Sequence, residues 1–198
     1  MRSSLRAMGT VVLSIILALS LTGCSCGDGE DISMITPYKY SSDMACIYEA
    51  FSSSASCPWG FEHDGIDFFA TGNLKPFQAV CSGVVTSVEL WNPGLHWQVS
   101  VNIRFNSIYW VSYAFEPSTN VQSDGETQLD NILVSEGQTV SQGDIIGYLY
   151  TVDEYAHVHF GLYKKGYAIC PEPYFTPEAR DSILSLIHVA WPGANMCY

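Results

Sequence analysis

Basic residues are scarce in this chain of 198 residues, which has eight Lys and Arg against twenty Asp and Glu. The formal net charge is −12 at pH 7. Proteins that bind nucleic acid neutralise its phosphates with basic side chains, and anionic lipid surfaces attract the same side chains. The composition therefore excludes a nucleic-acid-binding protein and a domain that adheres to anionic lipid through its folded surface.

Cysteine pairs with the spacing of a thiolate zinc site are also missing. None of the seven cysteines forms a Cys-x2-Cys pair, so disulfides are the better interpretation. The sequence does not reveal their pairing. Beyond Cys24, which has a separate role below, the cysteines are Cys26, Cys46, Cys57, Cys81, Cys170 and Cys197.

A long apolar run occurs only near the amino terminus. Val11 to Leu21 is apolar except for two serines and follows Arg2 and Arg6. This run is too short for a membrane-spanning helix and is typical of a signal peptide. The ending Leu21-Thr22-Gly23-Cys24 resembles the lipobox of bacterial lipoproteins. The resemblance implies cleavage before Cys24 and a lipid anchor on it, in an exported protein of the bacterial cell envelope; an ordinary secretory signal is the alternative.

The domain organisation follows from these segments. Residues 1–23 are predicted to be the lipoprotein signal peptide, and the small, polar, acidic residues 24–45 a flexible tether. Residues 46–175 are predicted to form the folded domain, and residues 176–198 a helix and tail. There is no long repeat and no low-complexity block.

Strand patterns dominate residues 60 to 170. Residues 97–105 alternate apolar and polar side chains with a period of two, and residues 107–115 read as their hairpin partner. Thr176 and Pro177 are typical of a helix start and precede an apolar stripe that ends before Pro192. We expect an all-β fold, in which antiparallel β-sheets form an open barrel-sandwich-like core with one C-terminal helix. Further strands are expected at residues 80–90, 144–151 and 157–163.

Histidine is rare, yet three of the five histidines lie in two short clusters with an aspartate. One cluster is His63-x3-Asp67, where Gly65 disfavours a regular helix, and the other is His157-Val158-His159. In a strand His157 and His159 point to the same face. Two imidazoles and one carboxylate form the ligand set of an open, catalytic zinc site. The plainer alternative is a surface loop with solvated carboxylates, because a His-x-His pair alone is a weak signal.

Four motifs together resemble the lysostaphin-type, LytM-like zinc metallopeptidases (peptidase family M23), which cut peptide crosslinks of bacterial cell walls. Besides the two histidine clusters, residues 75–85 resemble the strand after the first motif, and residues 134–147 resemble the family's glycine-containing hairpin. The resemblance implies that His63, Asp67 and His159 bind Zn²⁺ and that His157 is the catalytic base. It also implies that peptidoglycan peptides are the substrate or ligand.

Two positions depart from the family pattern. Phe115 stands where the family has a second catalytic histidine, in Tyr113-Ala114-Phe115-Glu116, and a phenylalanine cannot donate a hydrogen bond to an oxyanion. Losing one such donor costs about a hundred- to a thousandfold in rate. Tyr113, Tyr109 or His96 are candidate substitutes, although His96 and His188 read as structural. The second departure is Gly161, where the family commonly has glutamate.

Several functions therefore stay open. The first is an active zinc endopeptidase, and the second is a catalytically weak zinc-binding relative that binds peptidoglycan or regulates other wall hydrolases. Two histidines and a carboxylate also match the triad of non-haem iron oxygenases. The glycine hairpin resembles a lipoyl or biotinyl carrier but lacks a modification site. Substrate specificity is expected in the loops at residues 91–97 and 116–128.

Overall fold

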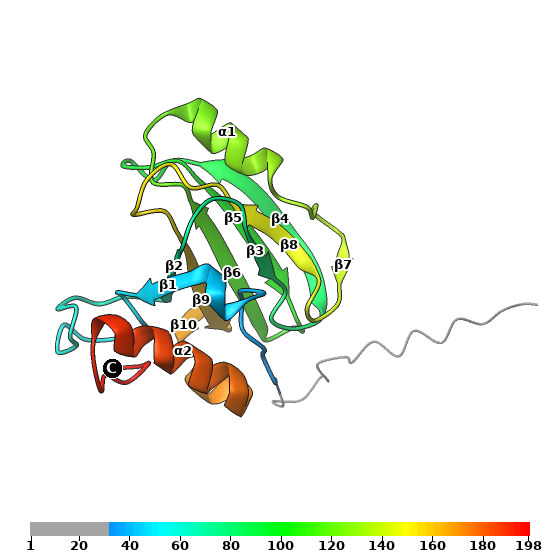
Figure 1. Cartoon of the computed structure of the whole chain (residues 1–198). Helices are drawn as coiled ribbons and strands as arrows, with labels where there is room; N and C mark the ends of the chain where they lie inside the picture. Colours follow the sequence, from blue (N-terminus) through cyan, green and yellow to red (C-terminus); the bar gives the residue numbers. More distant parts are fainter. Residues whose placement is uncertain (1–31) are drawn as a thin grey trace, which may run out of the picture.

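The computed structural model describes residues 32–198, and a large antiparallel sheet forms most of it (Figure 1). The strand order is β1-β2-β9-β6-β5-β4-β7, and β10 pairs with the end of β9 that β2 does not cover. A second, two-stranded sheet pairs β3 with β8. The strands are β1 (Met44–Ile47), β2 (Ile66–Ala70), β3 (Lys75–Gln78), β4 (Gly83–Trp91), β5 (Gln98–Arg104), β6 (Tyr109–Glu116), β7 (Thr139–Val140), β8 (Ile145–Leu149), β9 (His157–Lys164) and β10 (Tyr167–Ile169).

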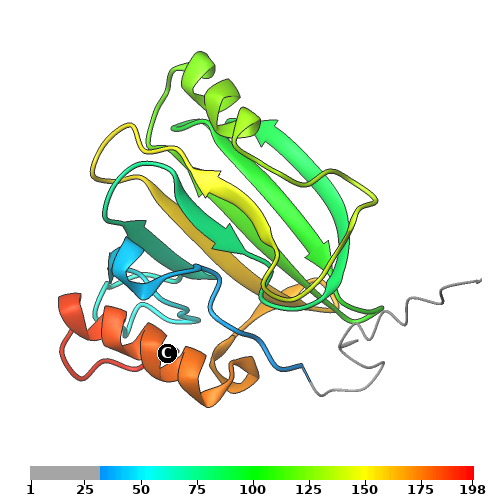
Figure 2. The ribbon, with the colours of Figure 1, turned by 45° about the vertical axis from the view of Figure 1, so that its right-hand side comes forward.

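The core lies between the two sheets, and strand periodicity creates it. On β5 the alternate residues Val99, Val101 and Ile103 are completely buried, as the period-two pattern predicts. Phe77 of β3 meets Phe115 of β6 with ring centroids 5.7 Å apart. Figures 1 and 2 both show the β3–β8 pair lying over one face of the large sheet. The predicted all-β fold with antiparallel, open sheets is confirmed.

The C-terminal helix is also confirmed. Helix α2 (Pro177–Ala190) begins after Thr176, whose side chain accepts a hydrogen bond from the Ala179 N–H, and it packs against β1. Its apolar side includes the fully buried Ile183 and Ile187.

A second helix was not expected. Helix α1 (Gln122–Asp130) replaces part of the loop expected at residues 116–128. Its sequence has almost no apolar periodicity, which is why the pattern missed it. Gly125 lets this helix approach the sheet, because a Cβ there would lie 2.7 Å from the Cβ of Trp97. Figure 2 places α1 and α2 at opposite ends of the molecule. Two short 3-10 turns complete the structure, at Ser41–Asp43 and Glu172–Tyr174.

The segment before β1 belongs to the folded body. Ile32, Met34 and Tyr38 are buried, and the Met34 N–H donates to the Tyr174 carbonyl at 2.7 Å. The Tyr38 hydroxyl lies 2.7 Å from the Ser182 hydroxyl of α2. The expected tether therefore does not extend over residues 32–45, because apolar side chains in this stretch complete the core. Residues 1–31, including the predicted signal peptide, Cys24 and Cys26, lie outside the described residues.

The cysteines follow the disulfide interpretation only in part. Cys170 and Cys197 form a disulfide that ties the end of β10 to the C-terminus, and Cys81 is also disulfide-bonded. Cys46 and Cys57 are free thiols, one buried and one half-buried. None of the helices described in residues 32–198 has the length and apolar character needed to cross a membrane.

Candidate metal centre

The pairing of β2 with β9 brings the two histidine clusters together. Asp67 is the register partner of His159, and Phe69 that of His157. His63 lies just before β2, where its backbone exchanges two hydrogen bonds of 2.8 Å with Ser52. The expected loop leading into a strand is therefore present, and two distant sequence motifs meet on one face of the sheet.

Three of these side chains converge on one point. His63, Asp67 and His159 each offer one ligand atom, and these atoms lie within 4.8 Å of one another. His63 Nε2 is 3.3 Å from one carboxylate oxygen of Asp67, and His159 Nδ1 is 2.8 Å from the other. Two ligands about 2.1 Å from a tetrahedral zinc lie about 3.4 Å apart. The donor set and its spacing thus fit a zinc ion.

The outer ring nitrogens of these histidines also have partners. His63 Nδ1 lies 3.1 Å from the carbonyl oxygen of Ala50, which can only accept a hydrogen bond, so Nδ1 carries the proton. His159 Nε2 faces the Asp64 carboxylate at 3.4 Å. These contacts hold the rings in place and leave His63 Nε2 and His159 Nδ1 directed at Asp67. Carboxylates and carbonyls behind ligating histidines are a regular feature of metal sites.

Asp64 is one of the carboxylates that the plainer alternative, a surface loop, would leave solvated. Its carboxylate accepts a hydrogen bond of 3.2 Å from the Tyr163 hydroxyl, and the Tyr163 ring stacks on Trp110 with centroids 4.0 Å apart. Gly161 makes room for this arrangement, since a Cβ there would lie 2.8 Å from the Tyr163 ring. The departure at Gly161 thus accompanies a tyrosine that holds Asp64 beside His159.

The charges of the centre stabilise one another. Burial lowers the pKa of His159, but hydrogen bonds to Asp64 and Asp67 outweigh it and raise that pKa to about 10. The hydrogen bond with His159 lowers the pKa of Asp64 to about 2. Burial disfavours the charge on Asp67, yet the nearby histidines hold its pKa well below its usual range. Burial likewise opposes a charge on His63, whose pKa the hydrogen bond and charge of Asp67 nevertheless raise.

His157 has different surroundings. Its Nδ1 lies 2.8 Å from the carbonyl oxygen of Tyr155, so Nδ1 carries a proton and Nε2 is the basic nitrogen. Nε2 is 3.7 Å from Asp67 and 3.7 Å from Glu116. The ring stacks on Phe69, with centroids 4.9 Å apart. This second ring nitrogen therefore faces the three converging side chains from one side.

Phe115 does not face the centre, which corrects the sequence interpretation. In the β6–β9 register Phe115 pairs with Val158, whereas Glu116 pairs with His157 and Ala114 with His159. Directly opposite residues share a face of the sheet, and Phe115 is completely buried in the core. Glu116 is thus the side chain that β6 presents to His157, and nothing in the sequence marked it.

The candidate substitutes for a second histidine lie elsewhere. Tyr109 and Tyr113 are buried in the core, and the Tyr113 hydroxyl donates to the Gln78 carbonyl at 3.1 Å. His96 is exposed in a loop, and His188 Nε2 donates to the Ala194 carbonyl at 3.0 Å. All five histidines lie in the described residues, and only His63, His157 and His159 belong to the centre.

Comparison with known proteins agrees with this geometry. A sequence profile described as peptidase family M23 matches residues 61–171, which is more than half of the chain. No curated protein matches the sequence. The profile match covers both histidine clusters.

Solved structures with a TM-score above 0.5 share the fold. A chain of the SpoIIQ–SpoIIIAH pore-forming complex is 21% identical, with a TM-score of 0.55 over 78% of this chain and 97% of the other. Csd3 of Helicobacter pylori is 22% identical, with a TM-score of 0.53 over 78% of this chain and 40% of its own. A zinc-containing peptidase from Vibrio cholerae is 22% identical, with a TM-score of 0.48 over 70% of this chain and 39% of its own. The chain thus spans about two fifths of the length of the last two proteins.

Proposed function

Because this chain belongs to peptidase family M23, we propose that it is a zinc-dependent endopeptidase that hydrolyses peptide bonds of bacterial cell-wall peptidoglycan. The convergence of His63, Asp67 and His159 carries this proposal. A donor set of two imidazole nitrogens and one carboxylate suits zinc with a fourth position free, rather than the oxygen-rich sites of magnesium or calcium. The same three ligands also suit iron, so metal analysis is part of the test.

Each side chain has a separate task in the proposed reaction. A zinc ion bound there would supply Lewis acidity, which polarises a peptide carbonyl and lowers the pKa of a water molecule. Asp67, His63 and His159 would hold the ion, and Ala50 and Asp64 orient the histidine rings. His157 would accept a proton at Nε2 from the attacking water and return it to the amine that leaves when the C–N bond breaks. Phe69 keeps the His157 ring in the required plane.

The second candidate is a zinc-binding relative that binds peptidoglycan or regulates other wall hydrolases without fast turnover. The observation in its favour is that His157 is the only imidazole of the centre beyond the ligands. A carboxylate, Glu116, occupies the facing position on β6. A carboxylate cannot donate a hydrogen bond to a developing oxyanion unless it is protonated.

One sample decides between the candidates. We expect the purified full-length chain to contain about one zinc per molecule and to cleave crosslinked wall peptides. Cleavage should stop on chelation and fall about a hundred- to ten-thousandfold in His157→Ala, with zinc retained. Stoichiometric zinc without turnover supports the second candidate, and iron in place of zinc contradicts both.

The envelope location is a further part of the proposal. We propose that a lipid on Cys24 anchors the domain to the membrane on the exported side. Lipid labelling of the full-length chain in cells should disappear in Cys24→Ala, whereas a cleaved, soluble product in both proteins would indicate an ordinary secretory signal.

A further inference from the structure

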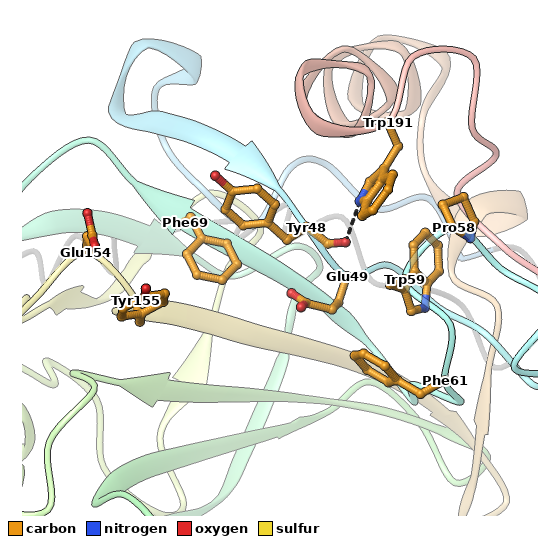
Figure 3. Close-up of a pocket in the computed structure, with 9 residues that line it drawn as sticks. All are labelled: Tyr48, Glu49, Pro58, Trp59, Phe61, Phe69, Glu154, Tyr155 and Trp191. Carbon is orange, nitrogen blue, oxygen red and sulfur yellow. Dashed lines mark hydrogen bonds between the residues drawn. The ribbon is translucent and has the colours of Figure 1, made fainter.

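An aromatic cavity of about 570 Å³ lies beside the metal centre. Figure 3 shows Glu49 near its middle, between Tyr48 and Phe69 on one side and Trp59 and Phe61 on the other. Tyr48, Phe61 and Tyr155 are each about half exposed or more, so their rings are open to a ligand. The six aromatic side chains of the wall are Tyr48, Trp59, Phe61, Phe69, Tyr155 and Trp191.

The charges of the wall have one sign. Glu49 and Glu154 are the charged residues that line the cavity, and the lining contains no Lys, Arg or His. Aromatic faces attract cations, most strongly where water is partly excluded. Carboxylates beside such rings add a second attraction of the same sign. The cavity therefore favours a cationic group over an anionic or a neutral one.

A sugar is a less suitable ligand for this wall, because a neutral sugar gains nothing from the negative charge of Glu49 and Glu154. The Trp191 Nε1 already donates to the carbonyl oxygen of Tyr48 at 2.7 Å, as the dashed line in Figure 3 marks. The two carboxylates suit the three donors of a primary ammonium group. The other polar groups of the lining are the hydroxyls of Tyr48 and Tyr155 and the Trp59 Nε1, which is buried without a hydrogen-bond partner among the described residues.

The cavity and the metal centre share a wall. Phe69 lines the cavity and stacks on His157. The backbone carbonyl of Glu49 accepts a hydrogen bond of 2.9 Å from the Asp67 N–H. A group bound in the cavity therefore lies next to the residues proposed to act on a peptide bond.

Much of the wall comes from outside the part that matches the family profile. The match covers residues 61–171, whereas Tyr48, Glu49, Pro58 and Trp59 precede it and Trp191 follows it. Helix α2 and the segment around β1 build this side of the cavity, so the cavity is a property of this chain and not of the matched region alone.

We propose that this cavity binds the positively charged amine side chain of a peptide substrate, and so selects peptides with a lysine-like residue near the bond to be cleaved. This inference rests on the proposed peptidase function, because the cavity borders the proposed catalytic centre. Glu154 and Glu49 would face the ammonium group, and the aromatic rings would cover the apolar part of the side chain.

The test measures binding separately from cleavage. The full-length chain, treated with a chelator so that no cleavage occurs, is titrated with the tripeptide Ala-Lys-Ala and with the same peptide acetylated at the lysine Nε. Quenching of tryptophan fluorescence reports binding, since Trp59 and Trp191 line the cavity. We expect the free amine to bind about tenfold more tightly than the acetylated form.

Matched variants locate the effect. Glu154→Gln removes one carboxylate from an exposed position of the wall and should reduce the preference to about threefold or less. Glu136→Gln makes the same change on an exposed turn far from the cavity and should keep the full preference. Equal binding of both peptides, or an unchanged preference in Glu154→Gln, overturns the inference, as does tighter binding of an N-acetylglucosamine oligomer than of the amine peptide.

The two proposals fail in different ways. A preserved amine preference without turnover of any wall peptide by the zinc-loaded chain contradicts the peptidase function and leaves the amine site standing. Turnover of wall peptides with equal binding of the two tripeptides contradicts the amine site alone.

Discussion

His157 and His159 lie two residues apart on one face of β9, yet their surroundings differ. Both ring nitrogens of His159 face carboxylates, at 2.8 and 3.4 Å. His157 has one nitrogen held by a backbone carbonyl, and its other nitrogen lies 3.7 Å from each of two carboxylates, those of Asp67 and Glu116. The proposed metal end of the centre, at His159, is therefore surrounded by carboxylates, whereas the proposed proton-transfer end is the single imidazole of His157. If the proposed function holds, variants of the two histidines should separate metal binding from catalysis.

The largest effect is expected from Asp67→Ala, which removes the carboxylate that all three histidines face. We expect the zinc content to fall from about one ion per chain to nearly none, with activity at background. Metal analysis after dialysis checks this. Asp130→Ala, an exposed aspartate on α1, is the matched control and should keep its zinc. Full zinc content in Asp67→Ala would show that the metal is held elsewhere.

The next effect concerns β6 and its register. Phe115→His places an imidazole in the core beside Phe77, and we expect the free energy of unfolding to fall by about 2 to 4 kcal/mol. The variant should not gain activity, because position 115 faces away from His157. Chemical denaturation and a cleavage assay measure both quantities.

Glu116→His is the matched partner of that variant. It places an imidazole opposite His157 at a partly exposed position, and its stability cost should stay below about 1 kcal/mol. A larger gain in cleavage rate from Phe115→His than from Glu116→His would contradict the register and restore the interpretation that Phe115 replaces a catalytic histidine.

These contrasts show what the sequence contained. The strand alternation in residues 97–105 and the pair His157 and His159 predicted the faces of the sheet correctly, because side-chain period is a local property. Asp64 and Glu116 were missed because their contacts with His159 and His157 arise from the pairing of distant strands, which no local pattern encodes. The low apolar content of residues 122–130 similarly concealed α1.

A smaller effect is expected at the ring partners of the metal end. Asp64→Asn weakens the contact behind His159 and should lower zinc affinity about 10- to 100-fold. Tyr163→Phe leaves Asp64 in place without its hydroxyl partner and should cost less. Competition with a fluorescent zinc chelator measures both, and equal affinities in wild type and Asp64→Asn would show that Asp64 does not support His159.

The smallest expected signal is the number of protons released on zinc binding. This number distinguishes most directly between the metal end of the centre, at His159, and the proton-transfer end, at His157. Because the pKa of His159 is raised from 6.5 to about 10 in the metal-free chain, the proton contributes stability that is complete below about pH 6.5 and is lost as the pH rises through about 10. Zinc must displace that proton, and the one on His63 Nε2, whose pKa is also raised. Calorimetric titration at pH 7 in two buffers of different ionisation enthalpy should therefore report release of about one to two protons per zinc, with apparent affinity rising towards pH 10. The Asp64→Asn variant should release fewer protons per zinc than the wild type, since it removes one cause of the raised pKa of His159. The His157→Ala variant should release the same number as the wild type, because His157 is not a proposed ligand. An equal reduction in the number of released protons in these two variants would mean that the metal and proton-transfer ends are not separable.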